Sequence, residues 1–288
     1  MPLLRILRPR HTVHSVHKIP HFIWNDKLPK AIRVSLIKTP TVFSALTEPD
    51  PERKCAQVAA LMLLLRFDAN EDAQRIPGRP ALPTLVPPNK VPYRGLGTPE
   101  GRAALIHAVA HIEFNAVNLA LDACWRFRDQ PDDYYRDWLS VAKDEARHFL
   151  MLSGRLKELG YAYGDFVAHN GLWEMAEKTA HDVLIRMALV PRVLEARGLD
   201  VTPGIIHRFT ELRDPETVRI LGIILEEEVR HVEVGTRWYR HFCALRGVDP
   251  DSTFRALLAE HRMRIRLPLN TEARARAGFN DQELQDAY

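Results

Sequence analysis

The sequence has few of the features that mark disulfide-bonded, zinc-binding or membrane-spanning proteins. Its three cysteines, Cys55, Cys124 and Cys243, are widely spaced, odd in number and form no CxxC pair. They fit the reduced thiols of a cytosolic protein better than a disulfide framework or a zinc site. The longest uninterrupted apolar run, residues 58–65, is much shorter than the roughly 18–20 residues that span a bilayer. We therefore expect a cytoplasmic protein with no membrane partner.

A large excess of charge of one sign is also lacking. The 288 residues carry 40 basic and 37 acidic side chains, a net charge of +3, with 46% hydrophobic residues. This composition is that of a globular protein with a sizeable core, and its bulk charge implies no acidic partner. The first 25 residues contain basic side chains and no acid, which suits a basic arm or, alternatively, an organelle transit peptide.

Strand patterns are almost absent, whereas four long stretches show the apolar period of an amphipathic helix. We expect these helices at residues 98–127, 132–160, 172–198 and 214–247. A shorter helix is expected from Pro51 to about Phe67. The connector at residues 77–99 contains seven prolines, so it can be neither helix nor central strand and should wrap over the following domain.

The short joins between these stretches predict an all-α protein built on an antiparallel four-helix bundle. Residues 1–40 would form a basic N-terminal segment, and residues 41–97 an N-terminal helix followed by the proline-rich wrap. The bundle would occupy residues 98–248, and residues 249–288 a C-terminal helical tail.

Six polar residues lie on the apolar stripes of the four long helices, where an uncompensated charge is costly. They are Glu113, Glu145, His148, Glu195, Glu228 and His231. Each Glu-x-x-His pair, in "DEARHF" (144–149) and "EEVRHV" (227–232), places both side chains on one helix face. A pair of metal ions would compensate the four carboxylates, and the mixed oxygen and nitrogen ligands suit iron or manganese more than zinc. Glu145 and Glu228 are the expected bridging ligands.

A single Glu-x-x-His pair is usually a solvated surface pair, so the argument depends on the repetition. Glu113 precedes Glu145 by 32 positions, and Glu195 precedes Glu228 by 33. Two half-bundles with ligands at matched depth therefore favour a metal site. Glu177 shares the predicted inner face of Glu195, but its depth places it far from the Glu228 layer.

Other polar residues near these positions allow two interpretations. Asp144 and Glu227 each precede a candidate ligand, and an acid from a neighbouring helix can accept a hydrogen bond from the ring N–H of a metal-bound histidine; plain surface exposure is the alternative. Arg147 and Arg230 are expected in salt bridges on the bundle exterior. His107 and His111, four residues apart, are expected at the surface or behind the ligands.

The predicted ligand pattern is that of ferritin-like di-iron bundles, with a Glu from each of two helices and a Glu-x-x-His from each of the others. Five stretches resemble the ferritin-like domain-of-unknown-function 455 family over roughly residues 40–280: "GTPEGRAALIHAVAHIEFNAVNLALDA", "DEARHF", "ELGYAYGDFVAHNGLWE", "LVPRVLEARGLDVTP" and "GTRWYRHFCALRG". The resemblance implies a ferritin-like fold and a di-iron site. It also suggests a distant likeness to tRNA-modifying di-iron hydroxylases, which makes RNA a candidate substrate.

We therefore expect a non-haem di-iron protein, with manganese or mixed manganese–iron as the alternatives, that activates O2 and hydroxylates or otherwise oxidises a substrate. Electrons would come from an external donor, because no flavin or ferredoxin motif is apparent. A ferroxidase or iron-storage protein is the second hypothesis, and a non-catalytic helical scaffold is the third. The extensions on both sides of the bundle favour a monomer or small homo-oligomer over a storage cage.

Overall fold

The computed structural model describes residues 40–62, 72 and 76–285. Within these residues there are helices and no strand; a single bridge joins Leu85 to Ala168. The prediction of an all-α protein is confirmed. The elements are α2 (Val42–Thr47), α3 (Pro51–Ala60), η2 (Pro88–Lys90), α4 (Pro99–Arg126), α5 (Asp132–Glu158), α6 (Gly171–Lys178), α7 (Val183–Leu189), η3 (Val190–Glu195), α8 (Ala196–Glu211), α9 (Pro215–Arg246), α10 (Pro250–Glu260), α11 (Thr271–Arg276) and α12 (Asp281–Gln285).

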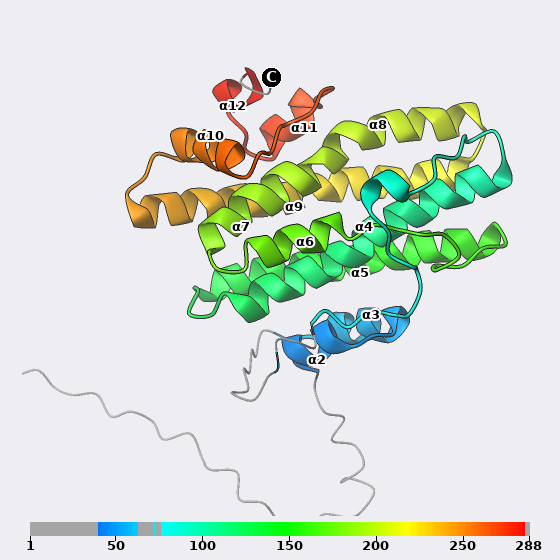
Figure 1. Ribbon diagram of the computed structural model, residues 1–288, viewed down its shortest axis with the longest axis horizontal. Coiled ribbons are helices and arrows are strands. Elements are labelled where there is room, and N and C mark those ends of the chain that lie inside the picture. The colour runs from blue at the N-terminus through cyan, green and yellow to red at the C-terminus, as the bar shows by residue number, and fades with distance from the viewer. Residues whose placement is uncertain (1–39, 63–71, 73–75, 286–288) are drawn as a thin grey trace, which may run out of the picture. The chain divides into compact units, whose positions relative to one another are not determined.

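Four long rods form the centre of the molecule (Figure 1). Helices α4 and α5 pack along their length as one antiparallel pair, and α8 and α9 form a second pair. Helix α5 also contacts α9, and α7 and η3 continue the α8 rod along α9. The short connections after α4 and α8 leave no room for a crossover, so consecutive helices run antiparallel.

Local sequence explains where the long helices start. The Thr98 side chain accepts a hydrogen bond from the Gly101 N–H at the start of α4, and Asp214 accepts one from Thr217 at the start of α9. Both helices have proline in the first turn, where the missing N–H has no intrahelical partner to lose. Helix α9 ends at Gly247, whose φ of 64° is the left-handed conformation that glycine adopts without strain.

The prediction of one helix over residues 172–198 is wrong. Helix α6 ends at Lys178, and Asp182 starts α7 by accepting hydrogen bonds from the N–H groups of Leu184 and Ile185. Around Pro191 the chain forms the π-helix η3, because proline cannot donate the hydrogen bond that an α-helix needs there.

Helix α8 then passes through Pro203, in a stretch that lies outside the four long helices predicted from the sequence. Proline at this position leaves the Leu199 carbonyl without its usual intrahelical donor. The Asn270 side-chain amide donates to that carbonyl instead, at 3.2 Å. A donor from 71 residues further along the chain therefore satisfies the helix, which sequence periodicity could not show.

Two further differences concern the N-terminal part. Helix α2 was not predicted, although Thr41 and Ser44 form a capping box at its start. Helix α3 ends at Ala60 and not near Phe67, since Leu61 has an extended backbone. The predicted basic segment, except for residue 40, lies outside the described residues, as do residues 63–71.

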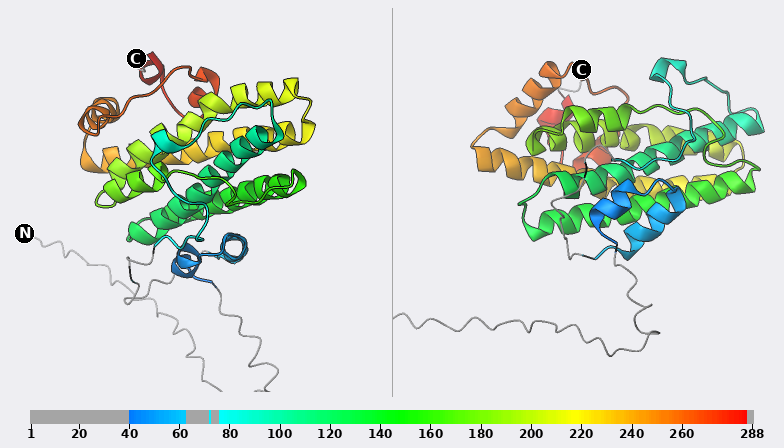
Figure 2. Two further views of the ribbon diagram at one scale, coloured as in Figure 1. Left: turned by 45° about the vertical axis from the view of Figure 1, so that its right-hand side comes forward. Right: turned by 60° about the horizontal axis from the view of Figure 1, so that its bottom comes forward.

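The extensions cover different sides of the bundle. Helices α2 and α3 pack on α4 and α5, whereas α10, α11 and α12 lie on the side of α8 and α9 (Figures 1 and 2). The proline-rich connector pairs with the loop before α6, with the Val86 N–H donating to the Ala168 carbonyl at 2.8 Å. The chain therefore supplies its own cover for both helix pairs.

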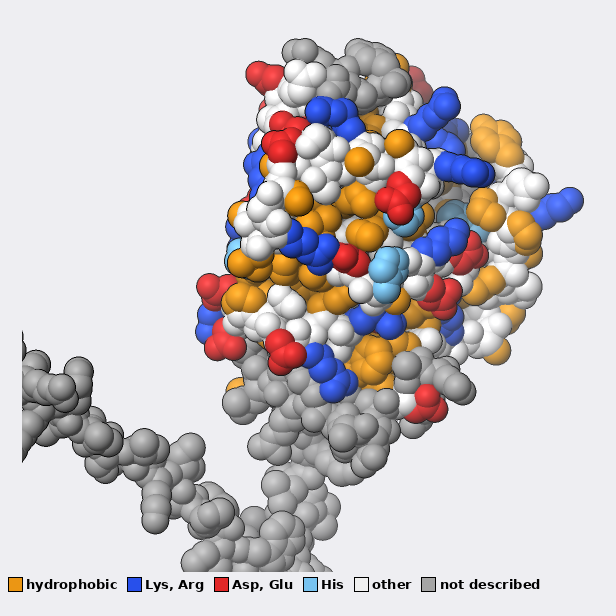
Figure 3. All heavy atoms as spheres, turned by 60° about the vertical axis from the view of Figure 1, so that its left-hand side comes forward, with side chains coloured by type: hydrophobic (Ala, Val, Ile, Leu, Met, Phe, Trp, Pro, Cys, Tyr) orange, Lys and Arg blue, Asp and Glu red, His pale blue; other side chains and the backbone are white. Residues whose placement is uncertain are grey.

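Helix α4 is the one described helix that is long and apolar enough to cross a membrane by length and composition. Its most apolar window is 72% buried inside the structure, as expected for the central helix of a soluble bundle. The face in Figure 3 mixes apolar side chains with charged groups of both signs. All three cysteines are buried free thiols.

Candidate metal centre

The six predicted ligands converge in one layer of the bundle. Each rod contributes: Glu113 lies on α4, Glu145 and His148 on α5, Glu195 at the end of η3, and Glu228 and His231 on α9. Apart from Glu195, all of these residues are at most 9% exposed. The inward register that the apolar stripes predicted is therefore present in the folded chain.

Both histidines turn Nδ1 toward the carboxylates. His148 Nδ1 lies 3.1 Å from Glu113 Oε2 and 3.5 Å from Glu145 Oε2. His231 Nδ1 lies 2.9 Å from Glu145 Oε1 and 3.1 Å from Glu228 Oε1. Glu145 thus offers one oxygen to each histidine, which is the position that a bridging carboxylate requires. Potential ligand atoms of Glu113, Glu145, His148 and Glu228 all lie within 4.8 Å of one another, so this group can hold a metal ion.

Glu195 approaches this group from the π-helix. The residue is partly exposed, yet its Oε2 atom is buried and has no hydrogen-bond partner. Oε2 of Glu145 is also buried, and its 3.5 Å contact with His148 Nδ1 is long for a hydrogen bond. Buried polar atoms are nearly always satisfied, and a cation bound in this layer would satisfy both oxygens.

The electrostatics of the layer point the same way. Burial and the neighbouring charge of Glu145 raise the pKa of Glu113 to about 8. Burial and the charges of Glu228 and Glu145 raise the pKa of Glu195 well above its usual range. Although burial lowers it, hydrogen bonds with Glu113 and Glu145 raise the pKa of His148 to about 11. Without a metal cation, the folded layer therefore retains protons that the unfolded chain would release.

The outer nitrogens of the two histidines bind acids in a crossed arrangement. His148 Nε2, on α5, lies 2.7 Å from Glu227 Oε2 on α9. His231 Nε2, on α9, lies 3.4 Å from Asp144 Oδ2 on α5. Each acid thus serves the histidine of the opposite helix. Such a contact fixes the ring orientation and the proton on Nε2, which leaves Nδ1 free as a ligand. Of the two interpretations open for Asp144 and Glu227, the structure favours contact with the histidines.

Exchanging these acids for their amides should weaken metal binding. We expect Asp144→Asn and Glu227→Gln each to lower metal affinity about 10–100-fold, because an amide holds the imidazole proton less strongly. Glu233→Gln is the matched control, since Glu233 also lies on α9 but pairs with Arg237. Competition with a chelator of known affinity measures the change. Unchanged affinity in both variants would contradict the role of these contacts.

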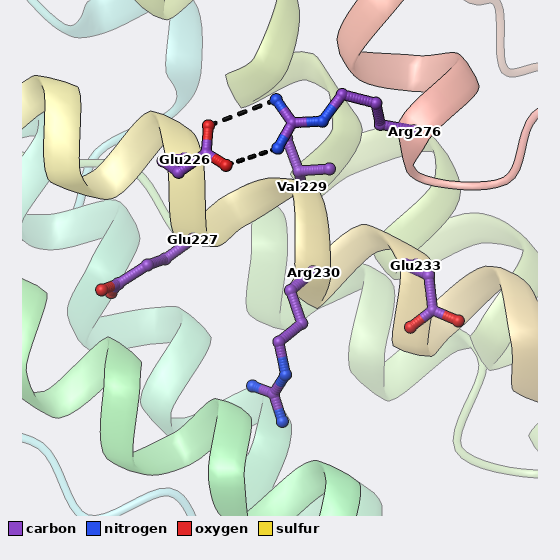
Figure 4. A pocket seen from close by; sticks show the side chains of 6 residues that line it. All are labelled: Glu226, Glu227, Val229, Arg230, Glu233 and Arg276. Carbon is purple, nitrogen blue, oxygen red and sulfur yellow. Dashed lines mark hydrogen bonds and ion pairs between the residues drawn. The ribbon is translucent and has the colours of Figure 1, made fainter.

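Arginines close the network at the surface, as predicted. Arg147 donates to both Asp144 and Glu227, and Arg230 donates to Asp144 and to Ser140. Figure 4 shows the pocket outside α9, where Glu227 and Arg230 extend toward α5 and Glu226 pairs with Arg276 of α11. The charged groups drawn there all have protein partners, so this pocket suggests no ligand of its own.

The rival candidates lie apart from the cluster. Glu177 is on the separate helix α6 and accepts a hydrogen bond from Trp173 Nε1 at 2.9 Å. Of the two positions predicted for His107 and His111, the one at the surface is wrong, because both residues are buried. His107 Nε2 accepts from the Gly164 N–H, and His111 lies 2.9 Å from the Tyr163 hydroxyl. These two histidines tie the loop after α5 to α4.

The geometry defines a class: an all-α bundle with a buried glutamate and histidine cluster that can hold metal. A family model described as "Protein of unknown function (DUF455)" matches residues 47–285, and the chain belongs to this family. An uncharacterized protein of Haemophilus influenzae is 45% identical over 265 residues, which cover 86% of this chain and 92% of the relative. No solved structure matches the chain. The membership of the DUF455 family that the sequence predicted is confirmed.

The pKa shifts predict how pH affects the metal-free protein. Glu113 binds its proton up to about pH 8 when folded and only up to about 4.5 when unfolded; the pKa of His148 is likewise raised, from 6.5 to about 11. Stability from such groups is complete below the unfolded pKa and is lost as pH rises through the folded value. We therefore expect the melting temperature of chelated protein to decrease as the pH is raised from about 5 to about 11.

Metal-loaded protein should lose less stability over this range, because the cations replace the protons. Although burial raises it, hydrogen bonds with His231 and Arg147 lower the pKa of Asp144 to about 2, so this acid does not titrate in the window. Thermal melts of chelated and loaded samples at each pH provide the measurement. A chelated sample that becomes more stable as pH rises would contradict the assignment.

Proposed function

We propose that the protein is a non-haem dinuclear metal protein, with iron as the favoured metal, that activates O2 to oxidise a substrate. The observation that carries this proposal is the convergence of four carboxylates and two imidazoles in one layer, in which the buried Oε2 of Glu195 has no hydrogen-bond partner. A ligand set of this chemistry suits iron or manganese, and it matches the residue types and helices of ferritin-like di-iron bundles.

Each of the clustered residues would have a distinct role in binding the metal ions. Glu113, Glu145, Glu195 and Glu228 would hold the cations, with Glu145 placed between the two histidines. His148 and His231 would bind through Nδ1 while Glu227 and Asp144 hold their Nε2 protons. A reduced iron pair bound there would supply electrons to O2, as such centres do, and an external donor would restore them.

Phe114 and Phe149 follow Glu113 and His148 in the sequence and pack together at 5.3 Å between ring centroids. Both are at most 2% exposed. Their burial next to the cluster would exclude bulk water from this side and limit side reactions.

The architecture favours an oxidase or oxygenase over an iron store. Storage subunits build a shell through the outer faces of their bundle. Here α2 and α3 cover α4 and α5, and α11 covers α8 and α9. RNA is the candidate substrate that the distant family likeness suggests. The face shown in Figure 3 carries charges of both signs and no continuous basic surface of the kind that binds nucleic acid.

Oxygen consumption distinguishes these functions. Reduced iron-loaded protein mixed with O2 should consume it in near-stoichiometric amounts and form no mineral core. Glu145→Ala protein is the control and should consume little. If iron added aerobically in large excess stays soluble and protein-bound, the storage function is correct and the oxygenase proposal is wrong. If metal binds without any O2 consumption, the cluster is not an O2-activating centre.

A further inference from the structure

A fully buried arginine lies three residues before Glu195. Arg192, in the π-helix η3, is 0% exposed and forms an ion pair with Glu283 of α12. Its guanidinium lies 4.2 Å from the ring centroid of Phe254, 4.6 Å from that of Tyr239 and 4.8 Å from that of Phe279. Burying a charged group in this way is costly unless it is paired and surrounded. Three aromatic rings and one carboxylate therefore surround the side chain of this one residue of η3.

Much of this surrounding comes from the end of the chain. Phe279 and Glu283 belong to the segment of residues 270–285, and Phe254 lies on α10. Only Tyr239 belongs to the four rods. The C-terminal tail, here residues 270–285, thus contacts η3 through Arg192, and its helices α11 and α12 lie outside the four rods (Figure 1).

The same tail also holds the chain just after Glu195. Arg274 forms a buried two-pronged pair with Asp200 of α8, at 2.8 Å for each contact. Its Nη2 also reaches the Ala196 carbonyl at 3.4 Å. Phe279 lies between the two arginines, 5.0 Å from the Arg274 guanidinium. Residues 270–285 therefore contact both η3, before Glu195, and the first turns of α8, after it.

Apolar packing brings the tail onto the ligand helices as well. A separate buried cluster joins the tail to the residues next to Glu195, Glu228 and His231; its members are Ala196, Leu199, Val229, Val232, Ala273, Ala277 and Phe279. The tail thus packs on both elements that supply the second half of the metal centre.

We propose that residues 270–285 act as a clamp that positions Glu195 for metal binding, with Arg192 as the positioning residue through which the clamp acts. The proposal rests on the proposed metal centre. Its physical reason is that Glu195 must be held beside Glu228 and Glu145 by a π-helix, whose hydrogen bonding is less favourable than that of an α-helix. Contacts from outside η3 are therefore needed to hold Glu195 in place, and residues 270–285 supply them at Arg192, Ala196 and Asp200.

The first test needs no metal. The double variant Arg192→Met/Glu283→Gln removes both charges of the pair, so no unpaired charge stays buried and the fold is retained. In metal-free protein we expect amide hydrogen exchange over residues 189–196 to accelerate on the order of tenfold or more, with α4 unchanged. Arg276→Gln is the matched control: Arg276 lies in the same tail, but its pair with Glu226 is exposed (Figure 4). Exchange that is unchanged, or accelerated equally in all helices, would overturn the clamp.

The second test measures metal. The double variant should bind iron on the order of tenfold more weakly than wild type, whereas Arg276→Gln should bind normally. Arg192→Lys, which keeps a cation among the rings, should recover part of the affinity. Wild-type affinity in the double variant would refute the positioning role even if η3 becomes mobile. If the wild type itself binds no metal, the proposed function fails, while the exchange result still decides whether the tail clamps η3.

Discussion

Replacing Glu145 or His231 by alanine is expected to remove most of the metal that the protein binds, from about two ions per chain in the wild type. Glu145→Ala should cause the largest loss of bound metal, because the two oxygens of Glu145 face the two histidines at 3.5 and 2.9 Å. Without it, neither half of the centre keeps its shared ligand. Metal analysis after reconstitution under identical conditions measures the effect. Full metal content in both variants would show that the cluster is not the metal site.

The same experiment separates Glu195 from Glu177, the two candidate glutamates in the stretch that the sequence predicted as one helix, residues 172–198. Glu195→Gln should lower metal content and change the spectrum of a coupled iron pair. Glu177→Gln should leave both intact, since Glu177 lies on α6 and accepts from Trp173. The two substitutions are chemically identical, so Glu177 serves as the matched control. The reverse outcome would place the site elsewhere along the bundle.

The second large effect is expected from Gly235→Ala. Gly235 lies on α9 one turn after His231, and a Cβ added there would be 2.3 Å from Cβ and 2.4 Å from Cγ of Pro191. The proline ring is rigid, so η3 must move away from α9. Overpacking of this kind costs about 1–3 kcal/mol of the free energy of unfolding. The shift also carries Glu195 away from Glu228, so metal affinity should fall together with stability.

Gly222→Ala provides the control on the same helix. Gly222 also lies within α9, but a Cβ there would meet nothing within 4 Å. Alanine should stabilise the helix at this position by up to about 1 kcal/mol, because glycine loses more backbone entropy on folding. Denaturant unfolding and metal titration of both variants complete the comparison. Equal behaviour of the two variants would mean that the contact between η3 and α9 is not close.

Much of the protein follows from local pattern. The starts of α4 and α9 are set by a capping side chain followed by proline, which act within one turn. Glu113, Glu145 and Glu228 are found from sequence because a helical period fixes which side chains share a face, and a charge on an apolar face is unusual. Those rules need no knowledge of the partner helix. They predicted the all-α bundle and the six residues that converge.

The third rod could not be derived in this way, because contacts distant in sequence decide it. Proline at position 203 removes one intrahelical hydrogen bond, and Asn270 supplies the donor that the Leu199 carbonyl needs. The crossed pairing of Asp144 with His231 and of Glu227 with His148 depends on how α5 lies against α9. The buried position of Arg192 requires rings and a carboxylate from α9, α10 and the tail. Periodicity records which face of a helix is buried, whereas only the tertiary structure decides what that face meets.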